Sequence, residues 1–257
     1  MAQQRLDLLL VQQGIASGRD QAKAFILLCQ VQVDGQRVDK AGAMVPDNAQ
    51  IVFSGNNNPY VSRGGLKLAK ALDEFAIDLA GRRVLDLGAS TGFTDCALQN
   101  GATEVIAVDV GYGQLAWSLR NDSRVRVLER TNARYLTAEA INGPVDFVTA
   151  DLAFISLTKV LPILPPLMND AAEAVVLVKP QFEAGRGQVG KKGVVKDPSV
   201  HEAVQPVNVS FSPITGPEGN IEYLLHLANR AEAPPDFSQR VVQTVAAAHA
   251  NLQPLRR

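Results

Sequence analysis

Hydrophobic and polar positions divide the chain into two regions with different periodicities. In the first 56 or so residues, apolar positions at helical spacing predict two short helices, over 8–11 and 22–28. Strand-like runs follow at 31–33, 36–38 and 49–53, and Asp34-Gly35 between the first two is a hairpin-turn signal. This pattern predicts a small α/β module that ends in the Ser/Gly/Asn/Pro stretch of residues 54–59.

From Gly64 onward, apolar runs alternate with helical segments. Helices are predicted over 66–75, 114–119 and 158–167, and strands over 84–87, 105–108, 125–128, 147–150 and 175–178. Such alternation is typical of an α/β fold with a doubly wound, mostly parallel, Rossmann-like sheet. The strands expected over 207–211 and 221–227 flank a Pro/Gly-rich turn, so we predict a terminal antiparallel hairpin and then a last helix over 237–252. The predicted organisation is therefore a small domain over 1–58, a linker over 59–64 and a large domain over 65–257.

Composition narrows the function classes. The chain has 257 residues, 46% of them hydrophobic, and a net charge of −1, so any contact with RNA has to come from local basic patches. Its two cysteines and three histidines have no metal-ligand spacing, and we expect no metal. The N-terminus lacks the apolar segment of a signal peptide, and no apolar run approaches the roughly 18 residues of a membrane span. We therefore expect a cytoplasmic protein with no membrane partner.

The most informative motif is a buried strand that leads through small residues into a helix. The strand carries Asp86, the turn spans residues 88–92, and the helix begins near Phe93. A second apolar run ends at Asp109, 23 residues after Asp86, which is the spacing of a βαβ unit whose second strand carries an acid for a ribose diol. The turn has a Gly-x-x-x-Gly spacing, looser than the Gly-x-Gly-x-x-Gly that a pyrophosphate requires. This favours S-adenosyl-L-methionine (AdoMet) over a dinucleotide.

Polar side chains also follow two later strands. Asp151 comes directly after the strand over 147–150, and Lys179 directly after the strand over 175–178. Because the carboxyl ends of parallel strands meet at one edge of the sheet, we expect both in the ligand crevice. Spacing alone predicts that Lys67, on a helix, and Glu222, at a strand start, are ordinary exposed residues. Residues 185–196 hold four basic residues, four glycines and no acid, and so form a candidate phosphate-binding loop.

Five strings of sequence carry a resemblance to a known family: YVSRGGLKL (60–68), DVGYGQL (109–115), ERTNAR (129–134), VKPQFE (178–183) and SPITGPEGN (212–220). With them, the chain resembles the TlyA family of RNA methyltransferases, also called the hemolysin A family, over about residues 3–228. The first domain is similar to the small RNA-binding module named after ribosomal protein S-four. The chain departs from the family in having a single glycine, Gly92, before Phe93 where two are usual, which predicts an altered cofactor loop.

The resemblance implies AdoMet-dependent methylation of the ribose 2′-hydroxyl of cytidine in small- or large-subunit ribosomal RNA, by an FtsJ-like domain with a Lys-Asp-Lys-Glu set. Matched by motif, the catalytic residues are Lys67, Asp151, Lys179 and Glu222. The expected cofactor-binding residues are Asp86, Gly88, Ala89, Ser90, Thr91, Gly92, Phe93, Asp109, Val110, Asn132 and Asp151. The expected RNA-binding residues are Arg5, Ser17, Arg19, Lys23, Arg63, Arg186, Lys191 and Lys192. The expected partner is ribosomal RNA or a ribosomal subunit, and the expected state is a monomer or weak homodimer.

The reaction itself explains why such residues are needed. A ribose hydroxyl is a poor nucleophile at neutral pH. Catalysis therefore requires in-line positioning and help in removing or stabilising the proton of the hydroxyl. We expect Lys179 to orient the hydroxyl, Asp151 and Glu222 to orient Lys179, and Lys67 to position the hydroxyl or a neighbouring phosphate. Three alternatives stay open at this point: a non-enzymatic RNA-binding or assembly factor, a hemolysin, and a nucleotide-linked oxidoreductase.

Overall fold

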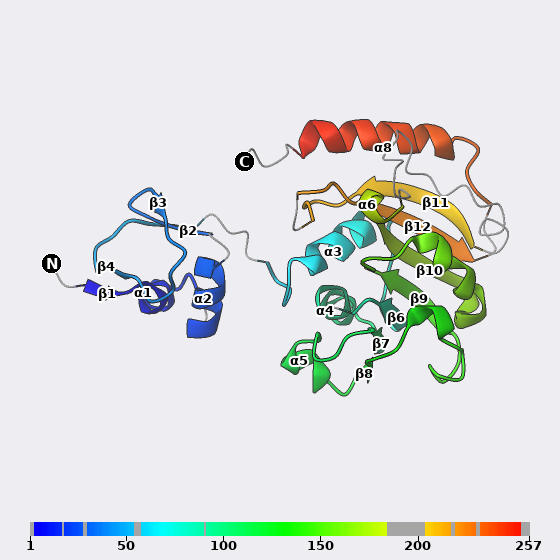
Figure 1. Cartoon of the computed structure of the whole chain (residues 1–257), viewed down its shortest axis with the longest axis horizontal. Coiled ribbons are helices and arrows are strands. Elements are labelled where there is room, and N and C mark those ends of the chain that lie inside the picture. Colours follow the sequence, from blue (N-terminus) through cyan, green and yellow to red (C-terminus); the bar gives the residue numbers. More distant parts are fainter. Residues whose placement is uncertain are drawn as a thin grey trace. The chain divides into compact units, whose positions relative to one another are not determined.

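The structure is a computed structural model, and it describes residues 3–16, 18–27, 30–53, 58–89, 91–183, 204–216, 219–229 and 232–252. The chain divides into two compact units, Met1–Pro59 and Tyr60–Arg257, which are described separately (Figure 1).

The N-terminal unit is a small α/β module around one apolar core. Its elements are β1 (Gln3–Arg5), α1 (Leu6–Gln12), α2 (Arg19–Leu27), β2 (Val31–Val33), β3 (Gln36–Arg37), β4 (Met44–Pro46) and β5 (Ile51–Phe53). Strand β2 pairs antiparallel with β3 and β5, and β1 pairs with β4. Asp34 and Gly35 have φ angles of 51° and 78°, the left-handed values that a tight hairpin needs. The two helices and this hairpin confirm the pattern-based prediction, whereas β1 and β4 were not predicted.

The larger unit is built on a seven-stranded sheet. Its parallel strands are β6 (Arg83–Leu87), β7 (Glu104–Val108), β8 (Val125–Leu128), β9 (Val145–Ala150) and β10 (Met168–Val178), and β11 (Val204–Phe211) and β12 (Tyr223–Asn229) complete it. The strand order is β11-β12-β10-β9-β6-β7-β8. Strand β12 is antiparallel to both β10 and β11, which confirms the terminal hairpin. From β6 the chain winds outward through β7 and β8 and then returns to β9 on the other side of β6, so the reversal lies between β6 and β9.

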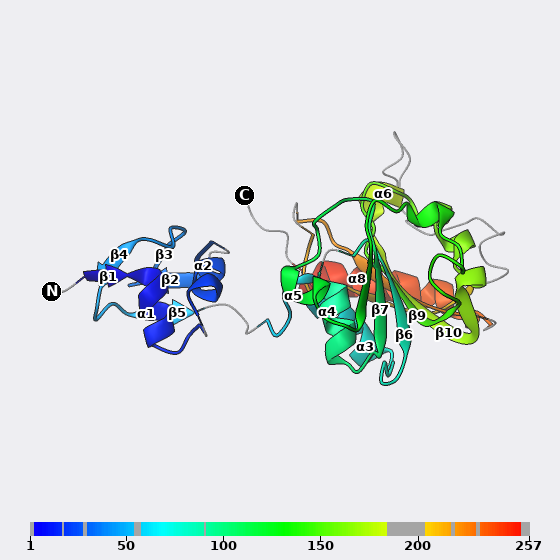
Figure 2. The same cartoon turned by 90° about the horizontal axis from the view of Figure 1, so that it is seen from below.

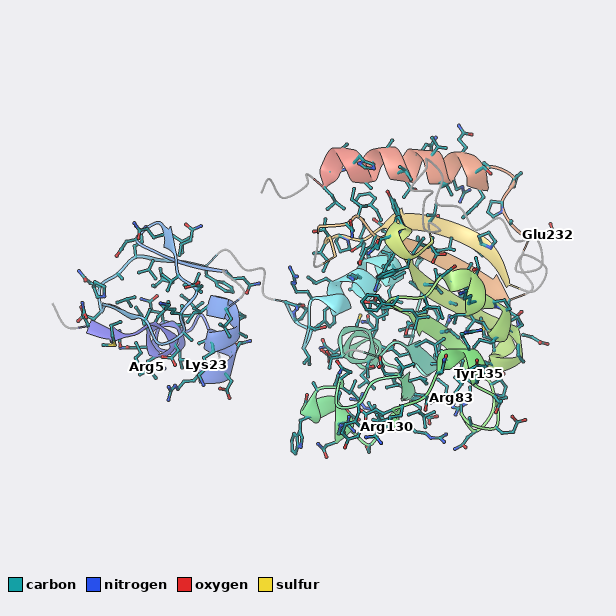
Figure 3. All side chains as sticks on the ribbon, viewed as in Figure 1. Arg5, Lys23, Arg83, Arg130, Tyr135 and Glu232 are labelled. Atoms are coloured by element: carbon teal, nitrogen blue, oxygen red, sulfur yellow. The ribbon has the colours of Figure 1, made fainter. Side chains whose placement is uncertain are left out.

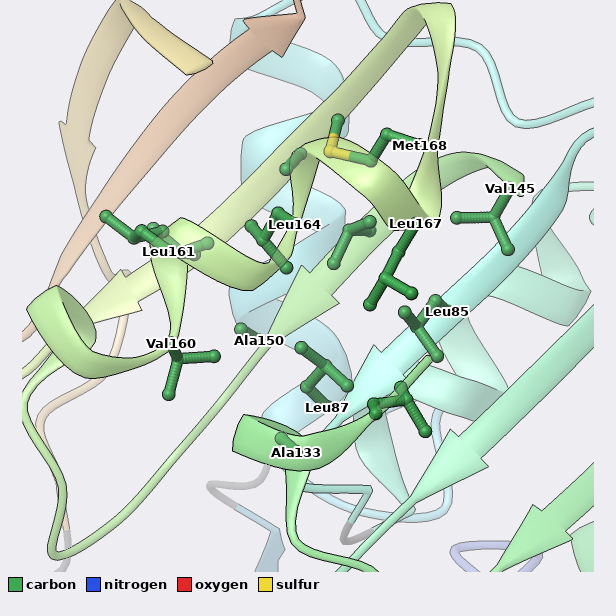
Figure 4. Close-up of a cluster of buried hydrophobic side chains, with 14 of the residues drawn as sticks. Leu85, Leu87, Ala133, Val145, Ala150, Val160, Leu161, Leu164, Leu167 and Met168 are labelled. Atoms are coloured by element: carbon green, nitrogen blue, oxygen red, sulfur yellow. The ribbon is translucent and has the colours of Figure 1, made fainter. Parts of the chain in front are cut away.

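Alternate residues of the strands point into two apolar layers, one on each face of the sheet. Val84 and Val105 face α3 (Gly64–Glu74) and α4 (Gly92–Gln99), which lie together against one face of the sheet (Figure 2). Leu85 and Ile106 face the other side, where the segment after β9 packs onto the sheet (Figure 4). Both faces of the sheet are therefore buried, as a doubly wound architecture requires.

One predicted helix is wrong in type. Residues 158–167 form three short 3-10 turns, η2 (Leu157–Lys159), η3 (Leu161–Ile163) and η4 (Pro165–Leu167), instead of one α-helix. Three prolines, at 162, 165 and 166, explain the difference, because proline removes a helical hydrogen bond and clashes with the preceding turn. The helix expected over 114–119 is reduced to α5 (Trp117–Arg120), and the last helix is α8 (Phe237–Asn251).

An ion-pair cluster ties β10 to β12 and to the residue before β6. Glu173 of β10 accepts from Arg82 at 2.8 Å and hydrogen bonds to His226 of β12 at 2.8 Å. These partners lower the pKa of Glu173 from its ordinary value to about 2. Within the described part of the chain, no helix is both long and apolar enough to cross a membrane.

Candidate functional site

A cavity of about 580 Å³ lies at the carboxyl ends of the parallel strands, beside the reversal between β6 and β9. Gly88 follows β6, Asp109 follows β7, Asp151 follows β9 and Lys179 follows β10, and all four line the cavity. Open α/β sheets bind ligands at this position, because the loops there diverge at the reversal. The cavity therefore coincides with the site that the strand-end pattern predicts.

The four residues expected to be catalytic meet in this cavity from distant parts of the chain. Lys67 comes from α3, and Glu222 directly precedes β12. The Lys67 Nζ lies 2.6 Å from Glu222 Oε2 and 3.6 Å from Asp151 Oδ2. The Lys179 Nζ lies 2.6 Å from Asp151 Oδ1. Asp151 thus bridges the two lysines.

These charges lie in a mostly dry environment. The Glu222 side chain is 2% exposed, and the other three side chains are 9–13% exposed. Charges at such low exposure interact more strongly than on a wet surface. The geometry also changes one expected role, because Glu222 contacts Lys67, whereas Lys179 is paired with Asp151. Lys179 is thus held by Asp151, and Lys67 by Glu222, with Asp151 as a second and more distant partner of Lys67.

The small-residue turn lets backbone segments approach closely. A Cβ on Gly88, whose φ is +79°, would lie 2.6 Å from the carbonyl oxygen of Asp151. A Cβ on Gly92 would lie 2.5 Å from the backbone nitrogen of Gly65. Both positions therefore require glycine. Thr91 beside Gly92 has a φ of 104°, a conformation that favours glycine, and this is the point where the chain has one glycine fewer than the family pattern.

Several of the expected cofactor-binding residues are buried and do not line the cavity. Asp86 is 1% exposed, and its carboxylate accepts hydrogen bonds from the hydroxyls of Thr94 at 2.7 Å and Thr149 at 2.9 Å. Burial raises the pKa of Asp86 to about 6. Ala89, Thr91, Gly92 and Phe93 are likewise buried and do not line the cavity. The structure thus places Asp86 where its carboxylate ties the end of β6 to α4 and β9.

The second strand end supplies an acid at the cavity wall. Asp109 lines the cavity, and its Oδ1 accepts from the backbone N–H of Gly111 at 2.6 Å. Val110 also lines the cavity and is 69% exposed. Asn132 is not among the lining residues. It caps the short turn η1 (Ala133–Tyr135) by accepting from the N–H of Arg134.

Sequence reasoning missed part of the cavity wall. Phe154 lines the cavity with its side chain 91% exposed, and its φ of 62° is unusual for an aromatic residue. Ile214, Thr215 and Gly216 line the cavity from the turn before β12. The sequence did hold signals for both parts of the wall. Phe154 lies three residues after Asp151, which was already expected in the crevice, and the turn lies within the family-like string over 212–220.

The expected RNA-binding residues occupy several environments. In the N-terminal unit, Arg5 and Arg19 both pair with the buried Asp7, at 3.0 and 3.2 Å, and Lys23 pairs with Asp20 at 3.1 Å. Figure 3 labels Arg5 and Lys23 on this unit. In the larger unit, Arg63 lines the cavity. The predicted residues Ser17, Ser90, Arg186, Lys191 and Lys192 lie outside the described residues. In the described ranges, no group of three or more His, Cys, Asp or Glu residues could hold a metal ion.

Comparisons with known proteins agree with this architecture. The pattern of FtsJ-like methyltransferases matches residues 60–229, and that of the S4 domain matches residues 4–51. The 16S/23S rRNA (cytidine-2′-O)-methyltransferase TlyA of Mycobacterium tuberculosis is 51% identical over 243 residues, which cover 89% of this chain and 91% of that protein. Hemolysin A of Brachyspira hyodysenteriae is 41% identical over 239 residues, covering 86% and 98%. The structure of a candidate hemolysin from Streptococcus thermophilus has a TM-score of 0.72 at 40% identity and covers 98% of this chain and 97% of its own.

Proposed function

The chain belongs to the TlyA (hemolysin A) family of FtsJ-like methyltransferases, and from this membership we propose that it methylates the ribose 2′-hydroxyl of cytidine in ribosomal RNA. Membership confirms the expected AdoMet-dependent methyltransferase domain and the RNA-binding module. It is at odds with the oxidoreductase alternative. The observation that carries the proposal is the pairing of two lysines through Asp151 at the floor of the cavity.

The cavity has features that suit AdoMet. Its volume of about 580 Å³ lies within the usual range of small-molecule sites. Asp109 offers a carboxylate at the wall for a ribose diol, and Gly88 lets the turn lie close to a ligand, since no side chain stands there. We propose that these residues, with Val110, hold the nucleoside end. When bound, AdoMet supplies an electrophilic methyl group on a sulfonium.

The remaining task falls to the chain's own side chains. We propose that Lys179, fixed by Asp151 at 2.6 Å, orients the 2′-hydroxyl and stabilises the negative charge that develops on its oxygen as the proton passes to solvent water. Lys67, held by Glu222 at 2.6 Å, would position the hydroxyl or an adjacent phosphate from the opposite side of Asp151. A fixed pair of this kind lowers the entropic cost of alignment.

We further propose a division of labour between the two parts of the chain. Residues 1–58 would grip structured RNA through Arg5, Arg19 and Lys23, residues 59–64 would link the domains, and residues 65–257 would carry the chemistry. Side chains 43–53% exposed in that module leave guanidinium and ammonium donors available to phosphates. A ribosomal substrate would place the activity in the cytoplasm, and we propose a monomer or weak homodimer that needs no metal.

The test is transfer of a tritium-labelled methyl group from AdoMet to unmodified ribosomal subunits. Wild type is expected to label the RNA, and Lys179→Met to lose about 10²–10⁴-fold in rate. Lys159→Met is the matched control, because Lys159 is an exposed lysine of the same unit, on η2, that does not line the cavity. Labelling that persists in Lys179→Met, with both proteins folded, would refute the assigned role. No labelling by wild type despite RNA binding would favour an assembly factor.

A further inference from the structure

Two loops at the catalytic end of the sheet are joined by a single carboxylate that does not line the cavity. One loop runs from Asp151, after β9, to Ser156. The other segment runs from Lys179, after β10, through the short helix α6 (Pro180–Glu183). Figure 2 shows α6 at the ends of these strands. Glu183 is the last residue of α6 and reaches across to the first loop.

Glu183 makes two hydrogen bonds to that loop. Its Oε1 accepts from the backbone N–H of Leu157 at 2.9 Å, and its Oε2 accepts from the Ser156 hydroxyl at 2.7 Å. Ser156 also caps η2 by accepting from the N–H of Thr158. The carboxylate therefore fixes the far end of the loop and the start of η2 together. Because the Glu183 carboxylate is the acceptor in both hydrogen bonds, both are of the stronger, charge-assisted type.

An aromatic contact accompanies these bonds. The rings of Phe154, in the loop, and Phe182, in α6, lie with centroids 5.2 Å apart. Phe154 has a φ of 62° and is 91% exposed, so neither its backbone conformation nor burial holds it in place. A residue in a sparsely populated conformation persists only where its surroundings fix it. The contacts to α6 supply that fixation.

We propose that Glu183 is a positioning residue for methyl transfer, which ties the Asp151 loop to the Lys179 segment and so maintains the 2.6 Å contact between Asp151 and Lys179. The inference rests on the proposed function, because it acts through that pair. Asp151 begins the tied loop, and Lys179 lies four residues before Glu183. If the tie is lost, the two loops separate and the lysine loses its alignment with the hydroxyl. A misplacement of about 1 Å at such a site can cost 10²-fold in rate.

The experiment compares Glu183→Ala and Glu183→Gln with a matched control at the opposite end of the same strands. Asp146 of β9 likewise accepts two hydrogen bonds, from Asn169 of β10 at 2.7 Å and from the backbone N–H of Arg83 at 2.9 Å. Asp146→Ala therefore removes an equivalent tie far from the cavity. The readouts are kcat and KM for RNA, AdoMet affinity by titration, and hydrogen exchange of the peptide spanning 152–157.

Glu183→Ala is expected to lower kcat by about 10–100-fold with little change in KM or AdoMet affinity. Glu183→Gln keeps a carbonyl for Leu157 and an amide that can bond to Ser156, and it is expected to restore kcat to within about threefold of wild type. Asp146→Ala should leave kcat unchanged. Exchange over 152–157 should speed up only in Glu183→Ala.

Other results would overturn the inference. They are an unchanged kcat in Glu183→Ala, an equal loss in Asp146→Ala, a Gln variant as poor as the Ala variant, or unchanged exchange over 152–157. The exchange measurement needs no activity. A wild type without RNA methylation would therefore refute the proposed function, while exchange would still decide whether Glu183 holds the loop.

Discussion

The ion pair between Lys67 and Glu222 has a large predicted effect on stability. The two groups lie 2.6 Å apart, with side chains 9% and 2% exposed, and they join α3 to the residue before β12 across 155 positions of sequence. Glu222→Ala removes the carboxylate and leaves a lysine with little access to water. A buried charge that loses its partner is costly, because neither solvent nor protein then compensates it.

The magnitude follows from what stays near Lys67. Breaking a buried pair typically costs about 3–5 kcal/mol. Asp151 Oδ2 remains 3.6 Å from the Lys67 Nζ, so we expect the lower end of that range, about 3 kcal/mol. In a domain of this size, 1 kcal/mol corresponds to about 2–4 °C, which gives a melting temperature lower by about 6–12 °C. Glu222→Gln keeps an acceptor for the lysine and should cost about 1–2 kcal/mol.

Calorimetry of the whole chain at pH 7 measures these shifts. The control is Asp236→Ala, since Asp236 pairs with Arg240 at 2.9 Å on an exposed face, where an ion pair contributes little to stability and its loss should barely move the melting temperature. A double variant, Lys67→Met with Glu222→Leu, should lose less than the sum of the two single changes, because it removes both charges. A Glu222→Ala variant as stable as wild type would refute the reasoning, as would additivity in the double variant.

Three further predictions concern stability. Gly92→Ala places a Cβ 2.5 Å from a backbone nitrogen and should cost about 1–3 kcal/mol, measured by thermal unfolding; an unchanged midpoint would contradict the close packing. Thr91→Gly relieves a φ of 104°. After the cost of glycine's greater flexibility in the unfolded chain is subtracted, the free energy of unfolding should rise by about 1 kcal/mol. A lower denaturant midpoint would contradict this. The pKa of Glu173 is lowered to about 2, so its contribution is fully present above its ordinary pKa and lost as pH falls from about 4.5 to 2. Denaturation at pH 7, 4 and 3 should therefore show wild type exceeding Glu173→Gln by about 1–2 kcal/mol at pH 7 and converging with it at low pH, and a constant difference would refute the shift.

Local patterns were sufficient for the sheet and for one edge of the site. The parallel strands are consecutive apolar runs, and Asp109, Asp151 and Lys179 follow them directly, so topology alone brings these side chains to one edge. Strand β10 begins at Met168, before the apolar run that predicted it. The apolar pattern missed this first part because Asn169, Asp170 and Ala171 are exposed.

Other features depend on contacts that a linear pattern does not contain. Lys67 and Glu222 have ordinary surroundings in sequence, and only the fold, or the family resemblance, brings them together. The 3-10 turns over 157–167 follow from prolines that apolar periodicity ignores. Asp86 has the spacing of a ligand-binding acid, yet two threonine hydroxyls from α4 and β9 surround it.

Nucleoside analysis of the methylated RNA tests the central claim most directly. RNA from a reaction with unmodified ribosomal subunits would be digested to nucleosides and resolved by mass spectrometry, for wild type and for Lys179→Met. We predict 2′-O-methylcytidine from wild type and its loss in the variant. A methyl group on a base, or equal yields of 2′-O-methylcytidine from both proteins, would contradict it.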